Sequence, residues 1–280
     1  MKRILVATDL TARSAFAIGR GSRIAAKQEA ELRFVHVSHF GATDDDRAVA
    51  RRKLFGQVEG HVGAPAGAKL DAAITIAAGA VPEAILEEAR QFSADLIVLG
   101  AHGEPSLKDV IFGTTTAFVI RNSRIPVLVV QEDHSIPYHT VMAAVVGDED
   151  DRLLETAFRI APAHDVYVVH AFPSPWRELI GVGSVMEDTR TEQEVQTLRV
   201  RRSLSAVGKA PSAARLHNIV EEGDVMEVID RAWRKAEPDL LILGTHGRGG
   251  LHRLFFGSYA ESVLLGYRSD LLVMRTGDAV

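Results

Sequence analysis

A glycine motif occurs twice in the chain at one constant spacing. The motif Gly-x2-Gly-x9-Gly-Ser/Thr begins at Gly100 and again at Gly244, and every member of the second copy lies 144 residues after its counterpart (244 − 100 = 144; 258 − 114 = 144). Matched positions at one offset indicate an internal duplication, so we expect two copies of one module. The two sets are Gly100, Gly103, Gly113 and Thr114, and Gly244, Gly247, Gly257 and Ser258.

Each repeat alternates strand-like and helix-like segments. In the first repeat we expect strands at 4–8, 32–37, 71–77, 96–99 and 127–130, and helices at 13–27, 44–62, 82–92 and 113–122. In the second we expect strands at 139–146, 166–171, 213–220, 240–243 and 271–274, and helices at 150–161, 192–207, 225–235 and 257–267. Five strands alternating with four helices predict an α/β fold: two doubly wound, five-stranded parallel-sheet domains.

The predicted domains are residues 1–133 and 138–280, joined by a linker at 134–137. Within the second repeat the offset rises from 134 (His36 with His170) to 150 (Arg51 with Arg201), which is 150 − 134 = 16 extra residues. We place this insertion around 173–190, as a lid over the second site or a docking surface between domains.

Composition excludes several classes of protein. A length of 280 residues favours about two domains. The net charge of −5 gives no reason to expect nucleic-acid or membrane-surface binding. The absence of cysteine excludes disulfides and thiolate metal sites. Since neither a signal peptide nor an apolar run of about 18 residues is present, we expect a soluble cytoplasmic protein.

The glycine motif indicates phosphate binding. Glycines let backbone N–H groups approach a ligand closely, and a Gly-Ser/Thr that opens a helix adds a hydroxyl and the positive end of a dipole. Leu99-Gly100 ends a predicted strand, and ligands of doubly wound folds bind at the carboxyl ends of strands. Neither loop contains the lysine of a P-loop, and no general base accompanies a nucleophile there.

With the first strand ending in Val6-Ala7-Thr8-Asp9 and the motif present twice, the chain resembles the universal stress protein family in its tandem form. The resemblance implies a Rossmann-like, adenine-nucleotide-binding fold, and members of the family divide into those that bind ATP and those that do not. Where ATP is bound, the motif residues hold phosphates and ribose, the strand-1 Asp meets the nucleoside, and backbone after the second strand lines the adenine pocket. The corresponding residues are Asp9, Val37, Gly100, Gly103, Gly113 and Thr114 in the first repeat, and Ala171, Gly244, Gly247, Gly257 and Ser258 in the second.

The two phosphate loops differ. The second contains Arg248-Gly249, whereas the first has Glu104-Pro105 in their place. A carboxylate beside a triphosphate costs on the order of 1 kcal/mol even when screened, and proline lacks an N–H donor. Phosphate recognition is therefore better preserved in the second loop, where Arg248 adds a cation.

The carboxylate that follows the first strand is better preserved in the first repeat than in the second. An unbroken offset of 136 places Val145 opposite Asp9, and Asp148 reaches that place only through a three-residue shift. The nucleoside carboxylate is therefore better preserved in the first repeat. Because phosphates contribute more charge and more hydrogen bonds, we favour the second domain as the ATP site.

Two functions stay open at this point. One is a stress-response regulator that binds ATP, with Mg²⁺, and acts as sensor or scaffold with at most slow ATP hydrolysis or autophosphorylation at Ser258. The other is a nucleotide-free, dimerising interaction protein with unidentified protein partners. An adenylating enzyme is disfavoured, because residues 9–14 lack the glycine-rich loop of that class. The apolar last strands at 127–130 and 271–274 are expected to be sheet edges with unpaired backbone groups. Since family members tend to pair through this strand, the resemblance implies that the two strands pair within one chain as a pseudo-dimer, or between chains as a homodimer.

Overall fold

The computed structural model describes a set of residue ranges that contains nearly all of the predicted strands. These are residues 1–62, 72–101, 114–131, 137–145, 151–161, 165–172, 190–191, 194–195, 197–198, 202, 215–244, 267 and 269–275. The predicted insertion at 173–190 and the predicted helices at 192–207 and 257–267 lie almost entirely outside these ranges.

The chain forms two compact units. Unit 1 comprises Met1–Ile136 together with Leu265–Val273, and unit 2 comprises Pro137–Leu264 with Met274–Val280. The last segment of the second repeat therefore belongs, by its contacts, to the unit built from the first repeat.

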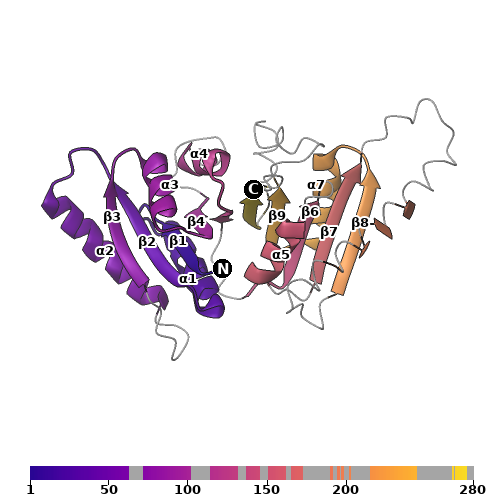
Figure 1. The fold of residues 1–280 in the computed structure, drawn as a ribbon, viewed down its shortest axis with the longest axis horizontal. Helices are drawn as coiled ribbons and strands as arrows, with labels where there is room; N and C mark the ends of the chain where they lie inside the picture. The colour runs from indigo at the N-terminus through magenta and orange to yellow at the C-terminus, as the bar shows by residue number, and fades with distance from the viewer. Residues whose placement is uncertain are drawn as a thin grey trace. The chain divides into compact units, whose positions relative to one another are not determined.

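Unit 1 contains a sheet in the order β3-β2-β1-β4-β5-β10. Figure 1 labels the first four strands of this order. Strands β1 to β5 are mutually parallel, as predicted. Central strands of such a sheet are covered on both faces, which explains why β4 and β5 read as continuous apolar runs and are buried. The strands are β1 (Arg3–Ala7), β2 (Glu31–Ser38), β3 (Ala72–Ala78), β4 (Leu96–Gly100), β5 (Val127–Val130) and β10 (Asp270–Met274).

Four helices cover the two faces of this sheet. Helix α1 (Ser14–Gln28) packs on β1 and β4 and against α2 (Asp44–Val62), which covers β3. Helix α3 (Val81–Gln91) packs on β2 and β3 and against α4 (Thr114–Asn122), which covers β5. Right-handed crossovers place the first pair on one face and the second pair on the other.

Helix α1 approaches β1 more closely than a side chain would allow. A Cβ atom on Gly21 would lie 2.4 Å from Cγ2 of Val6. Only glycine fits this position without a shift, so Gly21 sets the distance between the helix and the centre of the sheet. The neighbouring Arg20 is buried by the same close packing.

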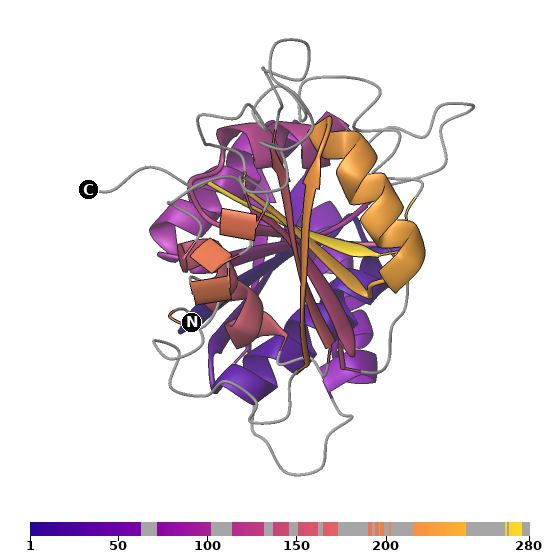
Figure 2. The same ribbon diagram turned by 90° about the vertical axis from the view of Figure 1, so that its right-hand side faces the viewer.

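The described part of unit 2 repeats this design with a parallel sheet in the order β9-β6-β7-β8. Helix α5 packs on β6 and β9, and α7 on β6, β7 and β8. Figure 2 shows α7 and β8, both orange, side by side. The elements are β6 (Thr140–Val145), α5 (Asp151–Ile160), β7 (Asp165–Phe172), β8 (Arg215–Glu222), α7 (Val225–Ala236) and β9 (Leu240–Gly244).

The last strands of the two repeats pair, as predicted. Strand β10 runs antiparallel to β5, with Leu271 opposite Val129, Leu272 opposite Leu128 and Val273 opposite Val127. All residues of both strands are buried. The apolar edge that β5 would otherwise expose is thus covered by the chain's own final strand.

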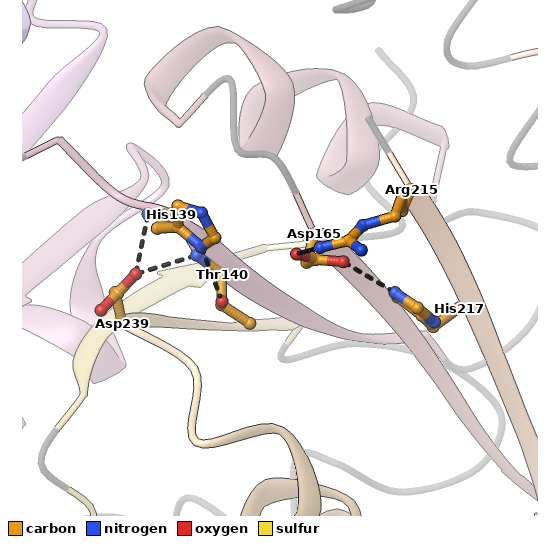
Figure 3. Close-up of polar contacts among 6 residues, drawn as sticks. All are labelled: His139, Thr140, Asp165, Arg215, His217 and Asp239. Atoms are coloured by element: carbon orange, nitrogen blue, oxygen red, sulfur yellow. Dashed lines mark hydrogen bonds and ion pairs between the residues drawn. The ribbon is translucent and has the colours of Figure 1, made fainter. Parts of the chain in front are cut away.

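An aspartate carboxylate accepts backbone hydrogen bonds at the start of the first strand of each repeat. In unit 2, Asp239 accepts hydrogen bonds from the backbone N–H groups of His139 (2.7 Å) and Thr140 (2.8 Å), at the start of β6 (Figure 3). In unit 1, Asp95 accepts equivalent bonds from Lys2 and Arg3 at the start of β1. Each carboxylate satisfies two N–H groups at the point where the sheet begins.

We expect Asp239→Ala to lower the free energy of unfolding of unit 2 by about 2 kcal/mol, because bonds to a charged acceptor contribute about 1.5–3 kcal/mol. Both tryptophans, Trp176 and Trp233, lie in unit 2, so urea unfolding followed by tryptophan fluorescence reports on this unit. Asp230→Ala is the matched control, since Asp230 forms an i,i+4 surface pair with Arg234 and its loss should cost less than about 0.5 kcal/mol. Equal losses in the two variants would contradict the stabilising role of Asp239.

Candidate functional site

The candidate site of unit 1 lies at the carboxyl ends of three neighbouring strands. Strand β1 pairs with β2 on one side and β4 on the other. Asp9 follows β1, Val37 is near the end of β2, and Gly100 ends β4. The fold thus places three of the predicted site residues at the carboxyl ends of neighbouring strands, the edge where parallel α/β sheets bind ligands.

The turn after β1 holds the Asp9 carboxylate in one orientation. Oδ1 of Asp9 accepts hydrogen bonds from the backbone N–H (2.9 Å) and the hydroxyl (2.7 Å) of Thr11. Leu10 adopts a left-handed φ of 65°, and its N–H donates to the Thr8 hydroxyl oxygen at 3.0 Å. The Thr8 and Ser14 hydroxyls lie 2.7 Å apart. Side chains from the turn itself thus stabilise a backbone conformation that leucine otherwise avoids.

These hydrogen bonds set the charge of Asp9. Partial burial raises the pKa of its carboxyl, but the bonds from Thr11, with a further contribution from Ser14, outweigh that effect, so the pKa is below its usual value. Asp9 is therefore an anion at neutral pH, and an ionised carboxylate accepts hydrogen bonds from hydroxyls and amines.

Neighbouring elements fix the turn from outside. The Thr8 carbonyl oxygen lies 2.9 Å from Nδ1 of His36 on β2, and the Thr8 N–H donates to the Val35 carbonyl at 3.0 Å. From α2, Nε2 of Gln57 donates to the Leu10 carbonyl at 3.2 Å. Sequence reasoning missed these contributions. Asp9-Leu10-Thr11 is readable as an Asx turn, but nothing in the sequence pairs Gln57 with a turn 47 residues earlier.

The two described ends of the first glycine loop lie close together. The Thr116 hydroxyl in the first turn of α4 donates to the Gly100 carbonyl at 3.2 Å, and the Ala101 N–H donates to the Val130 carbonyl at 3.0 Å. Thr114, the first residue of α4, is exposed. Gly103 and Gly113 lie outside the described residues.

Unit 2 places its described site residues in the same way. Gly244 ends β9, Ala171 is near the end of β7, and β6 lies between these two strands. Both residues are buried. The remaining predicted residues, Gly247, Arg248, Gly257 and Ser258, lie outside the described residues.

The sheet registers correct the predicted alignment of the first strands. Arg3 pairs with Glu31 in unit 1 and Thr140 with Asp165 in unit 2, so the strand offset is 140 − 3 = 137 where 136 was assumed. The aspartate hydrogen bonds agree, because His139 takes the place of Lys2 (139 − 2 = 137). The counterpart of Asp9 is therefore Val146 (9 + 137 = 146) and not Val145. The helix offset stays 136, so the second repeat has one residue fewer between strand and helix, which the sequence pattern alone did not locate.

A second polar cluster lies at the opposite ends of the strands in unit 2. Asp165, at the start of β7, accepts from Nη2 of Arg215 at 2.8 Å, and its other oxygen lies 2.8 Å from Nε2 of His217 (Figure 3). The His217 ring stacks on Tyr167, with centroids 4.4 Å apart. The hydrogen bonds from His217 and then Arg215 lower the pKa of the Asp165 carboxyl. Because parallel strands start here, this cluster ties β7 to β8 at the amino ends, away from the candidate site.

Within the described ranges, no group of three or more His, Asp or Glu side chains is arranged to hold a metal ion. In the same ranges, no helix has the length and apolar character needed to cross a membrane. The fold and the described site define a tandem α/β protein whose strand ends carry an aspartate and a glycine loop in the first repeat and a glycine loop in the second.

The profile of the Universal stress protein family matches residues 1–131 and 137–275, so the chain belongs to this family. The Universal stress protein E homolog of Haemophilus influenzae is 29% identical over 203 residues, which is 68% of this chain and 65% of that protein. The matched region thus spans just under two thirds of that relative.

A solved structure that covers nearly the whole chain has the same fold. A universal stress protein from Archaeoglobus fulgidus superimposes with a TM-score of 0.69 at 19% identity and covers 99% of this chain and 97% of its own. A universal stress protein solved in complex with cAMP is 24% identical over 46% of this chain and 96% of its own, with a TM-score of 0.38.

We expect Asp9→Asn to destabilise unit 1 at neutral pH and to lose this effect in acid. A carboxyl whose pKa is lowered by folding stabilises the native state above its unfolded pKa, about 4, and that contribution disappears as the pH falls through the folded pKa. The measurement is urea unfolding followed by far-UV circular dichroism at pH 7 and below pH 3. Tryptophan fluorescence of unit 2 serves as the internal reference.

Asp45→Asn is the matched control, because Asp45 is an exposed residue in the first turn of α2 and loses the same formal charge. A deficit in Asp9→Asn that persists unchanged in acid would show that the carboxylate charge is not its cause.

Proposed function

We propose that this universal stress protein binds ATP and acts as a nucleotide-dependent regulator, a sensor or scaffold, in a stress response. The observation that carries the proposal is the first glycine of each motif at the carboxyl end of a central strand, Gly100 at the end of β4 and Gly244 at the end of β9, where parallel α/β sheets bind ligands. The first repeat adds the preorganised Asp9 carboxylate, and the second adds Arg248 in its loop. An ionised carboxylate held by its own turn suits a ribose hydroxyl or a base amine, and the loop supplies backbone donors for phosphates.

We further propose that the second repeat binds the phosphates better than the first. Its loop has Arg248-Gly249 where the first has Glu104-Pro105, so it offers one more cation and one more N–H donor and lacks an opposing carboxylate. The second repeat lacks the carboxylate that would contact the nucleoside. In the corrected alignment Val146 is the counterpart of Asp9, and Asp148 is two residues further on (148 − 146 = 2). The second site therefore recognises the nucleoside through backbone near Ala171 and gains most of its affinity from phosphates.

The predicted consequence is one ATP bound per chain, in the second repeat. In isothermal titration calorimetry with Mg²⁺, Gly247→Val should abolish most of the heat, because a side chain there blocks the approach of backbone to phosphate. Gly103→Val at the matched position of the first repeat should change little. The reverse result would move the site to the first repeat.

Gly60→Val is the control for introducing valine at a glycine. Gly60 is exposed on α2, and a Cβ added there meets nothing within 4 Å. If the unmodified protein gives neither heat nor a thermal shift at millimolar ATP with Mg²⁺, the proposal is wrong and the chain is a nucleotide-free interaction protein.

We also propose slow autophosphorylation, in which the hydroxyl of Ser258, at the end of the second glycine motif, accepts the γ-phosphoryl group of ATP and ADP is released. Ser258→Ala should abolish incorporation of radiolabelled γ-phosphate into the protein while it leaves most ATP binding in place. Thr114→Val, at the matched position of the first repeat, should retain incorporation. Full incorporation in Ser258→Ala would exclude this residue as the acceptor.

A further inference from the structure

A buried ion pair holds the final strand in unit 1. Nε of Arg20 on α1 lies 3.1 Å from Oδ2 of Asp270, the first residue of β10, and the two side chains are only 3% and 0% exposed. The other oxygen of Asp270 accepts from the Gln131 N–H at 3.0 Å. Nε2 of Gln131 also donates to the Ser269 carbonyl at 2.8 Å. The start of β10 is thus fixed both to a helix and to the end of β5.

In the alignment of the two repeats, the Arg20–Asp270 pair has no equivalent ion pair. At the helix offset of 136, the counterpart of Arg20 is Thr156, and at the strand offset of 144, the counterpart of Asp270 is Pro126. Neither counterpart is ionisable. The cation is therefore specific to the first repeat and the carboxylate to the second.

The register of the β5–β10 pair specifies which residues would face each other if two copies of the chain paired through these strands. Leu272 of β10 lies opposite Leu128 of β5, and these two leucines are themselves counterparts (272 − 128 = 144). The same register between two copies of the chain would set Leu128 against Leu128, through β5, or Leu272 against Leu272, through β10.

Each alternative separates the charges. If β5 paired with β5 of a second copy, Arg20 would meet Pro126 where Asp270 now lies. If β10 paired with β10 of a second copy, Asp270 would meet Thr156 where Arg20 now lies. A buried charge deprived of its partner is strongly destabilising, even where the intact pair adds little to stability over an apolar one.

We propose that the Arg20–Asp270 pair selects the strand that completes unit 1. With this ion pair, β5 of unit 1 pairs with β10 from the second repeat and not with β5 of a second copy of the chain. The ion pair thus keeps the last strand of the second repeat paired with the first repeat, and any assembly of whole chains must use another surface. Loss of one charged partner should shift the choice of strand by about a hundredfold or more.

The test uses cysteine cross-linking in the full chain, which has no cysteine of its own. Directly opposed residues of antiparallel strands have Cβ atoms near the separation that a disulfide needs. Leu128→Cys with Leu272→Cys should form a disulfide within one chain on mild oxidation. Leu128→Cys alone, or Leu272→Cys alone, should give no covalent dimer across a range of protein concentrations. A disulfide-linked dimer from either single variant, with both charges intact, would overturn the proposal.

Neutralising the pair tests its role directly. In Arg20→Thr/Asp270→Asn, each alternative pairing loses its penalty, so Leu128→Cys should now give covalent dimers, at least tenfold more than with the charges present. Arg3→Gln/Glu31→Gln is the matched control, because this ion pair of the same unit is exposed and should leave the products unchanged. If Leu128→Cys in the neutralised protein still gives no covalent dimer at the highest concentration, tethering alone selects the strand and the ion pair does not.

Discussion

Arg20 and Asp270 come from the two repeats, 250 residues apart (270 − 20 = 250), and their contact lets the final strand of the chain finish the sheet of unit 1. The strand beside it, β5, is a run of four buried aliphatic residues that would otherwise be an open apolar edge. Because both charges are almost fully buried, the removal of either would deprive the other of its ion-pair partner, a change that costs about 3–5 kcal/mol for buried pairs. The integrity of unit 1 therefore depends on the second repeat.

The duplication has diverged in its site as well as in its sheet. The first repeat keeps Asp9 and builds a fixed turn around it, with Thr8, Thr11 and Gln57 as hydrogen-bonding partners. The second has an aliphatic residue, Val146, at the equivalent position but a glycine loop richer in donors and charge. Two modules of common origin thus differ at opposite parts of the candidate site, and the proposed ATP site is therefore assigned by the composition of its glycine loop.

Much of the fold was readable from the sequence. Buried strands such as Leu96–Gly100 and Val127–Val130 are continuous apolar runs, which only strands covered on both faces tolerate. The β1 turn was less readable, since its stability depends on His36 and Gln57 from other elements. The alignment of the first strands was wrong by one residue because no motif in that region marks where the second repeat is shorter, and backbone pairing alone reveals it.

The sequence by itself determined the duplication, the α/β class, the positions of the glycine motifs and their unequal composition. These follow from local pattern and spacing, which need no knowledge of what packs where. The tertiary structure decided that Arg20 meets Asp270, that β10 lies against β5 in the register of Leu272 with Leu128, and that Asp9 is held by Thr11 as an anion. Such outcomes depend on contacts between residues far apart in the chain and on burial, since charge pairing and pKa are properties of an environment that only the folded chain creates.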